Sequence, residues 1–314
     1  MKSTDLIKSI LFNLKFFKLT SLLNTGYIIA YHRIVEAPNA FFPEMGIDQF
    51  ERQIRHLTMN YNIIHVDELI QRIIQKKSLK NRVAITFDDG FVDNYTNAYP
   101  ILKKYNVPAT IFLISGCIET NEPPWFIKFR HAFKKTKKQE LNILLGDQRF
   151  QLKLCDMKNR LNSSNKIMAF LQTSPNDERK EYFDFILREL AYEDFSSLGN
   201  MMLSWEQIKE MSDNGIHFGA HTHTHPILSS LSLVEAEKEI RQSKEIIEKK
   251  LGKKVKGFAY PVGKKNHINK ELVPIFMKHG FQYSVTTSKN PINYKSNPFL
   301  LSRPYPWDFR CIKK

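Results

Sequence analysis

Short apolar segments alternate with amphipathic helical segments along most of this 314-residue chain, and this alternation limits its fold more than any other feature. Segment 82–89, RVAITFDD, is a continuous apolar run that ends in two acids, as expected of a parallel strand covered on both faces. Because parallel strands need long crossover connections, the pattern predicts an α/β sheet or barrel with functional groups at the carboxyl ends of its strands. The other predicted strands are GYIIAYHRI, PATIFLIS, IHFGAH, VKGFAYPVG and FQYSVTT.

Helix boundaries in the second half of the chain are marked by capping boxes. Ser204 with Gln207, and Ser232 with Glu235, have the spacing in which each side chain satisfies a backbone N–H of the first helical turn. Gly252 is expected to end the second of these helices, because glycine adopts the left-handed conformation easily.

One long segment interrupts the alternation. From about residue 119 to about residue 202 the strand patterns thin out, helical patterns dominate, and a lysine cluster occurs at 134–138. Ser174 is the expected N-cap of one of these helices, with Pro175 at its first position. We therefore expect a helical insertion, about 119–202, within a single barrel domain that spans residues 26–314.

Residues 1–25 form a predicted amphipathic helix with two interpretations. The segment LIKSILFNLKFFKLTSLL is apolar but interrupted by lysines, so it has neither the uninterrupted length of a membrane span nor the clean core of a signal peptide. Either the helix packs on the domain, or it lies on a membrane surface as a basic amphipathic helix.

The chain is strongly basic, and its 47 Lys and Arg against 32 Asp and Glu give a formal net charge of +15. Such a charge favours phosphates, nucleic acid or an acidic membrane surface as partners. We expect no nucleic acid, because no recognised binding module is present and the lysines are scattered through helices. The three cysteines, Cys117, Cys155 and Cys311, lie far apart and suit a reducing compartment rather than a disulfide framework.

Two polar groups follow predicted strands and suggest a metal site. Asp88 and Asp89 follow one strand, and the sequence HTHTH, with His221, His223 and His225, follows another. Asp-Asp-Gly alone is a common turn, and a histidine triplet alone is ambiguous. Together, at strand ends of one sheet, they predict a divalent ion with two imidazoles, a carboxylate and an open position for water. Successive strand residues point in different directions, so one aspartate can bind the ion while its neighbour acts as general base.

At this point the sequence resembles the polysaccharide deacetylases of carbohydrate esterase family 4, from about residue 27 to about residue 304. The resemblance rests on YHRI, TFDDGFVDNYTNAYPILKKY, GAHTHTHPIL, FAYPVG and a terminal SRP, and it is best to a subgroup with the N-terminal YHR motif. It implies a distorted (β/α)7-type barrel. By position it also implies Asp88 as catalytic base, Asp89, His221 and His225 as metal ligands, and the Val262 N–H as oxyanion donor, with His223 only a neighbour.

Two features of the family are missing from their usual places. Ala259 occupies the position of an arginine that pairs with the catalytic aspartate in many members, and no leucine-histidine motif follows residue 280. The segment YIIAYH resembles that late strand and its histidine moved to the front of the chain, which a closed barrel tolerates because its first and last strands are neighbours. His32 is then the general acid rather than a buried histidine at a strand end. Arg303 is then the replacement guanidinium rather than a surface residue.

The resemblance implies a metal-dependent hydrolase that removes the N-acetyl group from an amino sugar in a glycan or glycan precursor. The alternatives are a deformylase or O-deacetylase on a lipid-linked sugar, and a catalytically inactive carbohydrate-binding relic, which Ala259 would favour. The expected cofactor is one divalent ion, Zn²⁺, although a site of two histidines and an aspartate also accepts Co²⁺, Ni²⁺ or Fe²⁺. Trp125 either lines the sugar site or packs in the core.

Charge and the N-terminus lead to an expectation about location. Without an export signal, we expect a cytoplasmic enzyme, held peripherally on the inner membrane face, that acts on a phosphate- or lipid-linked N-acetyl sugar.

Overall fold

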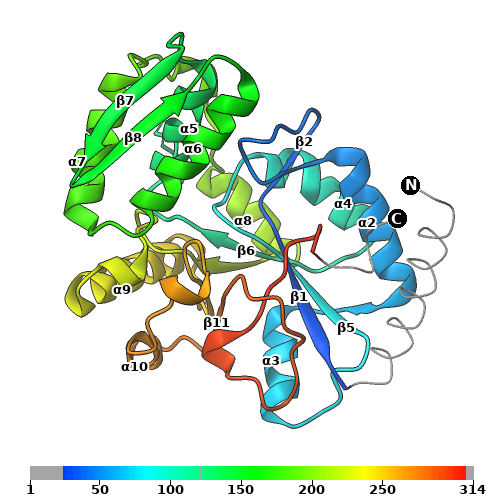
Figure 1. Cartoon of the computed structure of the whole chain (residues 1–314). Helices are drawn as coiled ribbons and strands as arrows, with labels where there is room; N and C mark the ends of the chain where they lie inside the picture. The colour runs from blue at the N-terminus through cyan, green and yellow to red at the C-terminus, as the bar shows by residue number, and fades with distance from the viewer. Residues whose placement is uncertain (1–23, 121, 309–314) are drawn as a thin grey trace, which may run out of the picture.

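A curled sheet of seven parallel strands forms the centre of the protein (Figure 1). The computed structural model describes residues 24–120 and 122–308. The strands run in the order β1, β5, β6, β9, β10 and β11, and β4 pairs with the amino end of β5. Their bounds are β1 Gly26–Tyr31, β4 Asn62–Ile63, β5 Arg82–Phe87, β6 Thr110–Leu113, β9 His217–Ala220, β10 Gly257–Ala259 and β11 Tyr283–Val285.

Helices cover the outside of the sheet, as the alternating sequence predicts. Both predicted capping boxes are present, and Gly252 ends its helix with a left-handed φ of 64°. The fold class, a distorted α/β barrel, is thereby confirmed. The helices are α2 Ile47–Asn60, α3 Val66–Ile74, α4 Tyr99–Lys104, α8 Trp205–Asp213, α9 Leu233–Leu251 and α10 Leu272–Lys278, and a π-helical turn, Asn94–Ala98, precedes α4.

The barrel closes through an irregular segment rather than through direct pairing of its first and last strands. Leu301 bridges Val285 of β11, and the Ala30 N–H of β1 donates to the Pro304 carbonyl at 3.0 Å. A regular strand cannot continue here, because proline has no N–H with which to extend the ladder. Arg303 lies within this closing segment and is fully buried.

The insertion folds around its own hydrophobic cluster and is not purely helical. Its helices are α5 Trp125–Lys135, α6 Met157–Leu171 and α7 Asn176–Glu189. In chain order, an antiparallel hairpin of β7 Glu140–Leu145 and β8 Gln148–Lys153 follows α5 and precedes α6 (Figure 1). The predicted helical insertion thus also contains a strand hairpin, which the sequence analysis did not predict. Leu141, Ile143 and Leu145 alternate with exposed residues, and the left-handed Gly146 (φ 56°) forms the turn, which is a strand pattern. Helix α7 has Pro175 as its N-cap, one residue later than predicted.

The remaining elements are short. Strands β2 (Arg33–Val35) and β3 (Glu44–Gly46) pair in a separate parallel sheet beside the barrel. The predicted N-terminal amphipathic helix lies outside the described residues, so it stays a prediction. Within the described part of the chain, no helix is long and apolar enough to cross a membrane.

Candidate active site

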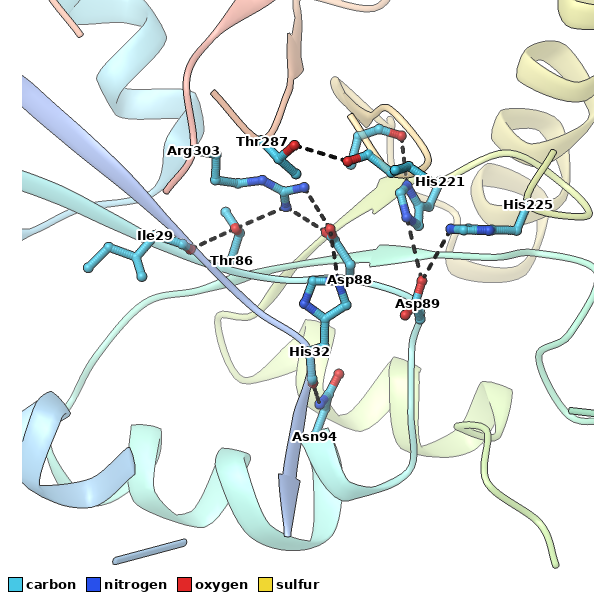
Figure 2. Close-up of polar contacts among 12 residues, drawn as sticks. Ile29, His32, Thr86, Asp88, Asp89, Asn94, His221, His225, Thr287 and Arg303 are labelled. Carbon is cyan, nitrogen blue, oxygen red and sulfur yellow. Dashed lines mark hydrogen bonds and ion pairs between the residues drawn. The ribbon is translucent and has the colours of Figure 1, made fainter. Parts of the chain in front are cut away.

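Three predicted metal ligands meet at the carboxyl ends of β5 and β9. Asp89, His221 and His225 are buried, and their ligand atoms all lie within 4.8 Å of one another. The Nε2 atoms of His221 and His225 are 3.5 and 3.7 Å from the Asp89 Oδ1 atom (Figure 2). His223 stands outside the group, because its Nδ1 atom forms a hydrogen bond of 3.0 Å with the Ser115 hydroxyl.

The donor set fits a divalent ion. The His221 Nδ1 atom lies 2.7 Å from the Ala259 carbonyl oxygen, so it must donate there, and the Nε2 lone pair faces Asp89. Burial lowers the pKa of His221 and lowers the pKa of His225 well below its usual range, so both imidazoles are neutral, as metal ligands must be. Burial and the neighbouring Asp88 charge raise the pKa of Asp89 well above its usual value. A bound cation would favour its ionised form.

The HTHTH loop has a backbone that needs support. Thr222 and His225 have φ values of 65° and 61°, a left-handed conformation that such residues rarely adopt. Glu239 of α9 holds the loop: its Oε2 atom accepts from the N–H groups of His223 and Thr224 at 2.8 and 2.9 Å, and its Oε1 atom accepts from the Thr224 hydroxyl at 2.8 Å. Glu239 therefore positions the turn between two predicted metal ligands.

This support predicts that Glu239→Ala weakens Zn²⁺ affinity about 10- to 100-fold, the usual effect of losing a group that orients metal ligands. Glu239→Gln should recover most of that affinity, because its amide oxygen can still accept from the loop. Competition with a chromophoric chelator measures both. The matched control is Glu245→Ala on the exposed face of the same helix, where Glu245 pairs with Arg241. Unchanged Zn²⁺ affinity in Glu239→Ala would contradict the positioning role.

Asp88 is held in a bidentate ion pair with Arg303. The Nη1 and Nη2 atoms of Arg303 donate to the two Asp88 carboxylate oxygens at 2.5 and 2.6 Å (Figure 2). Burial, the largest single effect, would raise the pKa of Asp88. The Arg303 charge and hydrogen bond, together with the neighbouring His221 and His32, outweigh burial and lower the pKa to about 2. The Arg303 Nη1 atom also donates to the Thr86 hydroxyl at 3.2 Å, and Thr86 donates to the Ile29 carbonyl. Arg303 thus provides Asp88 with a guanidinium, as expected from the sequence, where Ala259 stands at the usual arginine position.

His32 follows β1 and reaches the same carboxylate from the other side. Its Nε2 atom is 3.8 Å from the Asp88 Oδ2 atom, and Asn94 fixes its backbone by donating to the His32 carbonyl at 2.7 Å. Burial lowers the pKa of His32 to about 4, although the Asp88 charge opposes this shift. The fold thus places His32, near the N-terminus, at the position where the resemblance predicts the general acid.

Val262 has a strained backbone beside the cavity. Its φ of 61° is unusual for a β-branched residue, and the Thr287 hydroxyl donates to its carbonyl at 3.0 Å. Its N–H makes no hydrogen bond within residues 24–120 and 122–308. An N–H that binds an oxyanion must be free of other hydrogen bonds, and backbone strain is common at functional sites. The Val262 N–H meets both conditions.

A cavity of about 180 Å³ joins these groups to the insertion. Asp88, Asp89, His32 and Val262 line this cavity, and Trp125 of the insertion lines it too. The Trp125 Nε1–H donates to the His225 carbonyl at 3.2 Å. The cavity is also lined by Pro43, Phe126, Arg130, Met168, Gln172, His221, His225, Tyr260, Thr287 and Tyr305.

A larger cavity, about 400 Å³, lies at the amino ends of β9, β10 and β11. Its Asp67 side chain pairs with Lys256 at 3.2 Å and with His217 at 3.4 Å. In parallel α/β sheets, ligands bind at the carboxyl ends of the strands, so the smaller cavity is the candidate active site.

Comparison with known proteins fits this geometry. The family model for polysaccharide deacetylase matches residues 75–284, which is more than half of the chain. The chain belongs to the polysaccharide deacetylase family. Residues Asp88, Asp89, His221 and His225 all lie inside the matched region.

Individual relatives are distant. The chain is 24% identical to the protein YxkH of Bacillus subtilis (strain 168), whose name describes a polysaccharide deacetylase, over 88% of this chain and 69% of the relative. It is 24% identical to the poly-beta-1,6-N-acetyl-D-glucosamine N-deacetylase of Staphylococcus aureus (strain MRSA252), over 81% of this chain and 65% of the relative. The chain therefore spans about two thirds of the length of these relatives.

Solved structures show the same fold. The Streptococcus pyogenes deacetylase PplD in complex with acetate is 22% identical, with a TM-score of 0.59 over 90% of this chain and 92% of that chain. IcaB from Ammonifex degensii is 18% identical, with a TM-score of 0.59 over 90% of this chain and 91% of that chain.

Sequence reasoning missed the residues that act through tertiary contacts. Glu239 stands on a charged helix with many other glutamates, so no local pattern distinguished it. Phe126 is adjacent to Trp125, and its ring lies 4.6 Å from the His225 ring. Tyr305 follows the SRP motif and lies 5.6 Å from the His32 ring, so its position next to Arg303 was the available signal.

Proposed function

We propose that this protein is a metal-dependent hydrolase that removes the N-acetyl group from an amino sugar in a glycan or glycan precursor. The observation that supports it best is the convergence, in one cavity, of the Asp89–His221–His225 group with the Asp88–Arg303 ion pair and His32. A divalent ion held by the first group would polarise the acyl carbonyl and acidify water.

The chain's own residues have distinct roles in this proposal. Asp88, kept ionised by Arg303, accepts a proton from the attacking water. The Val262 N–H donates to the carbonyl oxygen as negative charge develops there. The proton that Asp88 takes from water passes to His32, whose Nε2 atom lies 3.8 Å from the Asp88 Oδ2 atom, and His32 delivers it to the leaving nitrogen. The products are acetate and a free amino sugar.

The Arg303 pairing also bears on the inactive-relic alternative. That alternative drew on Ala259, which lacks the guanidinium found in many family members. Arg303 provides a guanidinium to the same aspartate from another segment, so Ala259 gives no reason to infer decay. A deformylase or an O-deacetylase would use the same groups. Only an assay with each type of acylated sugar distinguishes these activities.

The proposed substrate and location extend the charge argument. A net charge of +15 favours a phosphate- or lipid-linked substrate and peripheral attachment to the inner face of a membrane. Co-sedimentation with anionic and neutral liposomes at low and high salt tests the attachment.

The function is tested by incubating Zn²⁺-loaded protein with N-acetyl, N-formyl and O-acetyl sugars, both free and phosphate-linked. We expect mass spectrometry to show loss of acetyl from the N-acetyl substrates with equimolar acetate. Binding of these sugars without release of any acyl group would favour the relic instead.

His32→Ala should reduce turnover about 10²- to 10⁴-fold while leaving the metal bound, because it removes a general acid and no ligand. Steady-state kinetics and elemental analysis of the same preparation measure the two effects. Turnover close to that of the unaltered protein would refute the permuted general acid, and attention would move to Tyr305, which also faces the cavity.

A further inference from the structure

Helix α5 of the insertion presents an aromatic and a cationic side chain to the cavity, one helical turn apart. Phe126 packs against the ring of the metal ligand His225, and Arg130, four residues later on the same face, lines the same cavity. The separation along the helix is about 6 Å. A substrate whose acyl group lies at the Asp89–His221–His225 group would therefore place a neighbouring part near Arg130.

Arg130 is a partly buried cation without an acidic partner. Its Nη1 atom donates to the Asn165 Oδ1 atom at 3.0 Å, and no carboxylate of the described chain forms an ion pair with it. Burial lowers its pKa, and no acidic neighbour opposes that shift. A desolvated cation gains stability when an anion binds beside it.

The carboxylates of the cavity are not available to Arg130. Asp88 is paired with Arg303, and Asp89 belongs to the proposed metal group. The Arg179 guanidinium lies 5.5 Å from the centre of the Trp125 ring on the insertion side and adds further positive charge. With a divalent ion bound, the cavity is positively charged overall, which favours an anionic substrate.

We propose that Arg130, together with the Gln172 amide that lines the same cavity, forms a subsite for an anionic group of the substrate. The anion is a phosphodiester or a carboxylate carried next to the sugar that is deacylated. Both accept two parallel N–H bonds from a guanidinium, which a lysine cannot provide. This inference rests on the proposed function, and it names the substrate class of the same site.

The first test measures binding, so it does not depend on turnover. Zn²⁺-loaded protein is titrated with N-acetylglucosamine 1-phosphate, with a disaccharide of N-acetylglucosamine and glucuronic acid, and with neutral N-acetylglucosamine oligomers, by Trp fluorescence and calorimetry. We expect Arg130→Gln to weaken the preferred anionic ligand about 10- to 100-fold relative to the neutral oligomer. Arg130→Lys should recover only part of the difference. The matched control is Arg149→Gln on the exposed hairpin strand β8, which should change nothing.

The outcomes separate the subsite from the proposed function. A loss confined to the phosphate identifies a phosphate-bearing substrate, and a loss confined to the uronate identifies a carboxylate. Either result supports the subsite, even if no ligand is hydrolysed. Since anions can also bind the metal, only the difference between the unaltered protein and Arg130→Gln counts. An anionic preference that is absent, or equal in both proteins, overturns the subsite. The acyl-release assay with neutral oligomers then decides the function separately.

Discussion

Alanine in place of Asp89, His221 or His225 should abolish stoichiometric binding of a divalent ion and reduce turnover about 10³-fold or more. Each residue provides one of three converging donor atoms from a buried position, and water replaces a missing protein ligand poorly in a site shaped for three. Elemental analysis after gel filtration measures the metal, and acetate release measures turnover.

The matched control is His223→Ala, within the same loop. The His223 ring bonds to Ser115 and is not one of the converging donors, so this variant should keep its metal. If His223→Ala lost the ion while His225→Ala kept it, the ligand assignment would be wrong.

The alternation of strands and helices made the barrel predictable, because each apolar run and each cap is a local signal. The closing segment was harder to foresee. Leu301 and Pro304 join β11 to β1 through isolated contacts, and no periodic pattern marks such contacts. The hairpin in the insertion did have a sequence signal, the alternation of Leu141, Ile143 and Leu145 with polar or exposed residues. This signal was missed because the hairpin strands are short and the surrounding helical patterns are long.

The site was predictable where residues stand at strand ends in a specific motif. Asp88, Asp89, His221 and His225 meet because parallel strands end at one edge of the barrel. Arg303 was a weaker prediction, since a guanidinium 215 positions away in sequence reaches Asp88 only after the barrel closes. Roles for Glu239 and Arg130 could not be predicted, because they follow from how a helix and an insertion pack against the barrel.

Asp88→Asn should reduce turnover about 10²- to 10⁴-fold with the metal still bound, because the amide cannot accept the proton from water. The loss should be equal from about pH 5 to about pH 8, since the pKa of Asp88 is lowered to about 2 and the carboxylate is ionised throughout. Rate measurements on metal-loaded protein across this range check both statements. If the difference in turnover between Asp88→Asn and the unaltered protein disappeared toward pH 5, Asp88 would not be the base.

The same substitution should also destabilise the fold by about 3–5 kcal/mol, because it leaves the fully buried Arg303 cation without its carboxylate. The lowered pKa gives Asp88 a stabilising contribution that is present above its unfolded pKa of about 4 and lost as the pH falls toward 2, so the difference from the unaltered protein should shrink in acid. The double variant Asp88→Asn, Arg303→Gln removes both charges. It should recover much of the stability in denaturant unfolding and none of the turnover, which separates the catalytic role of Asp88 from its part in the ion pair. Recovery of turnover together with stability would mean that Asp88 acts only by holding Arg303 in place.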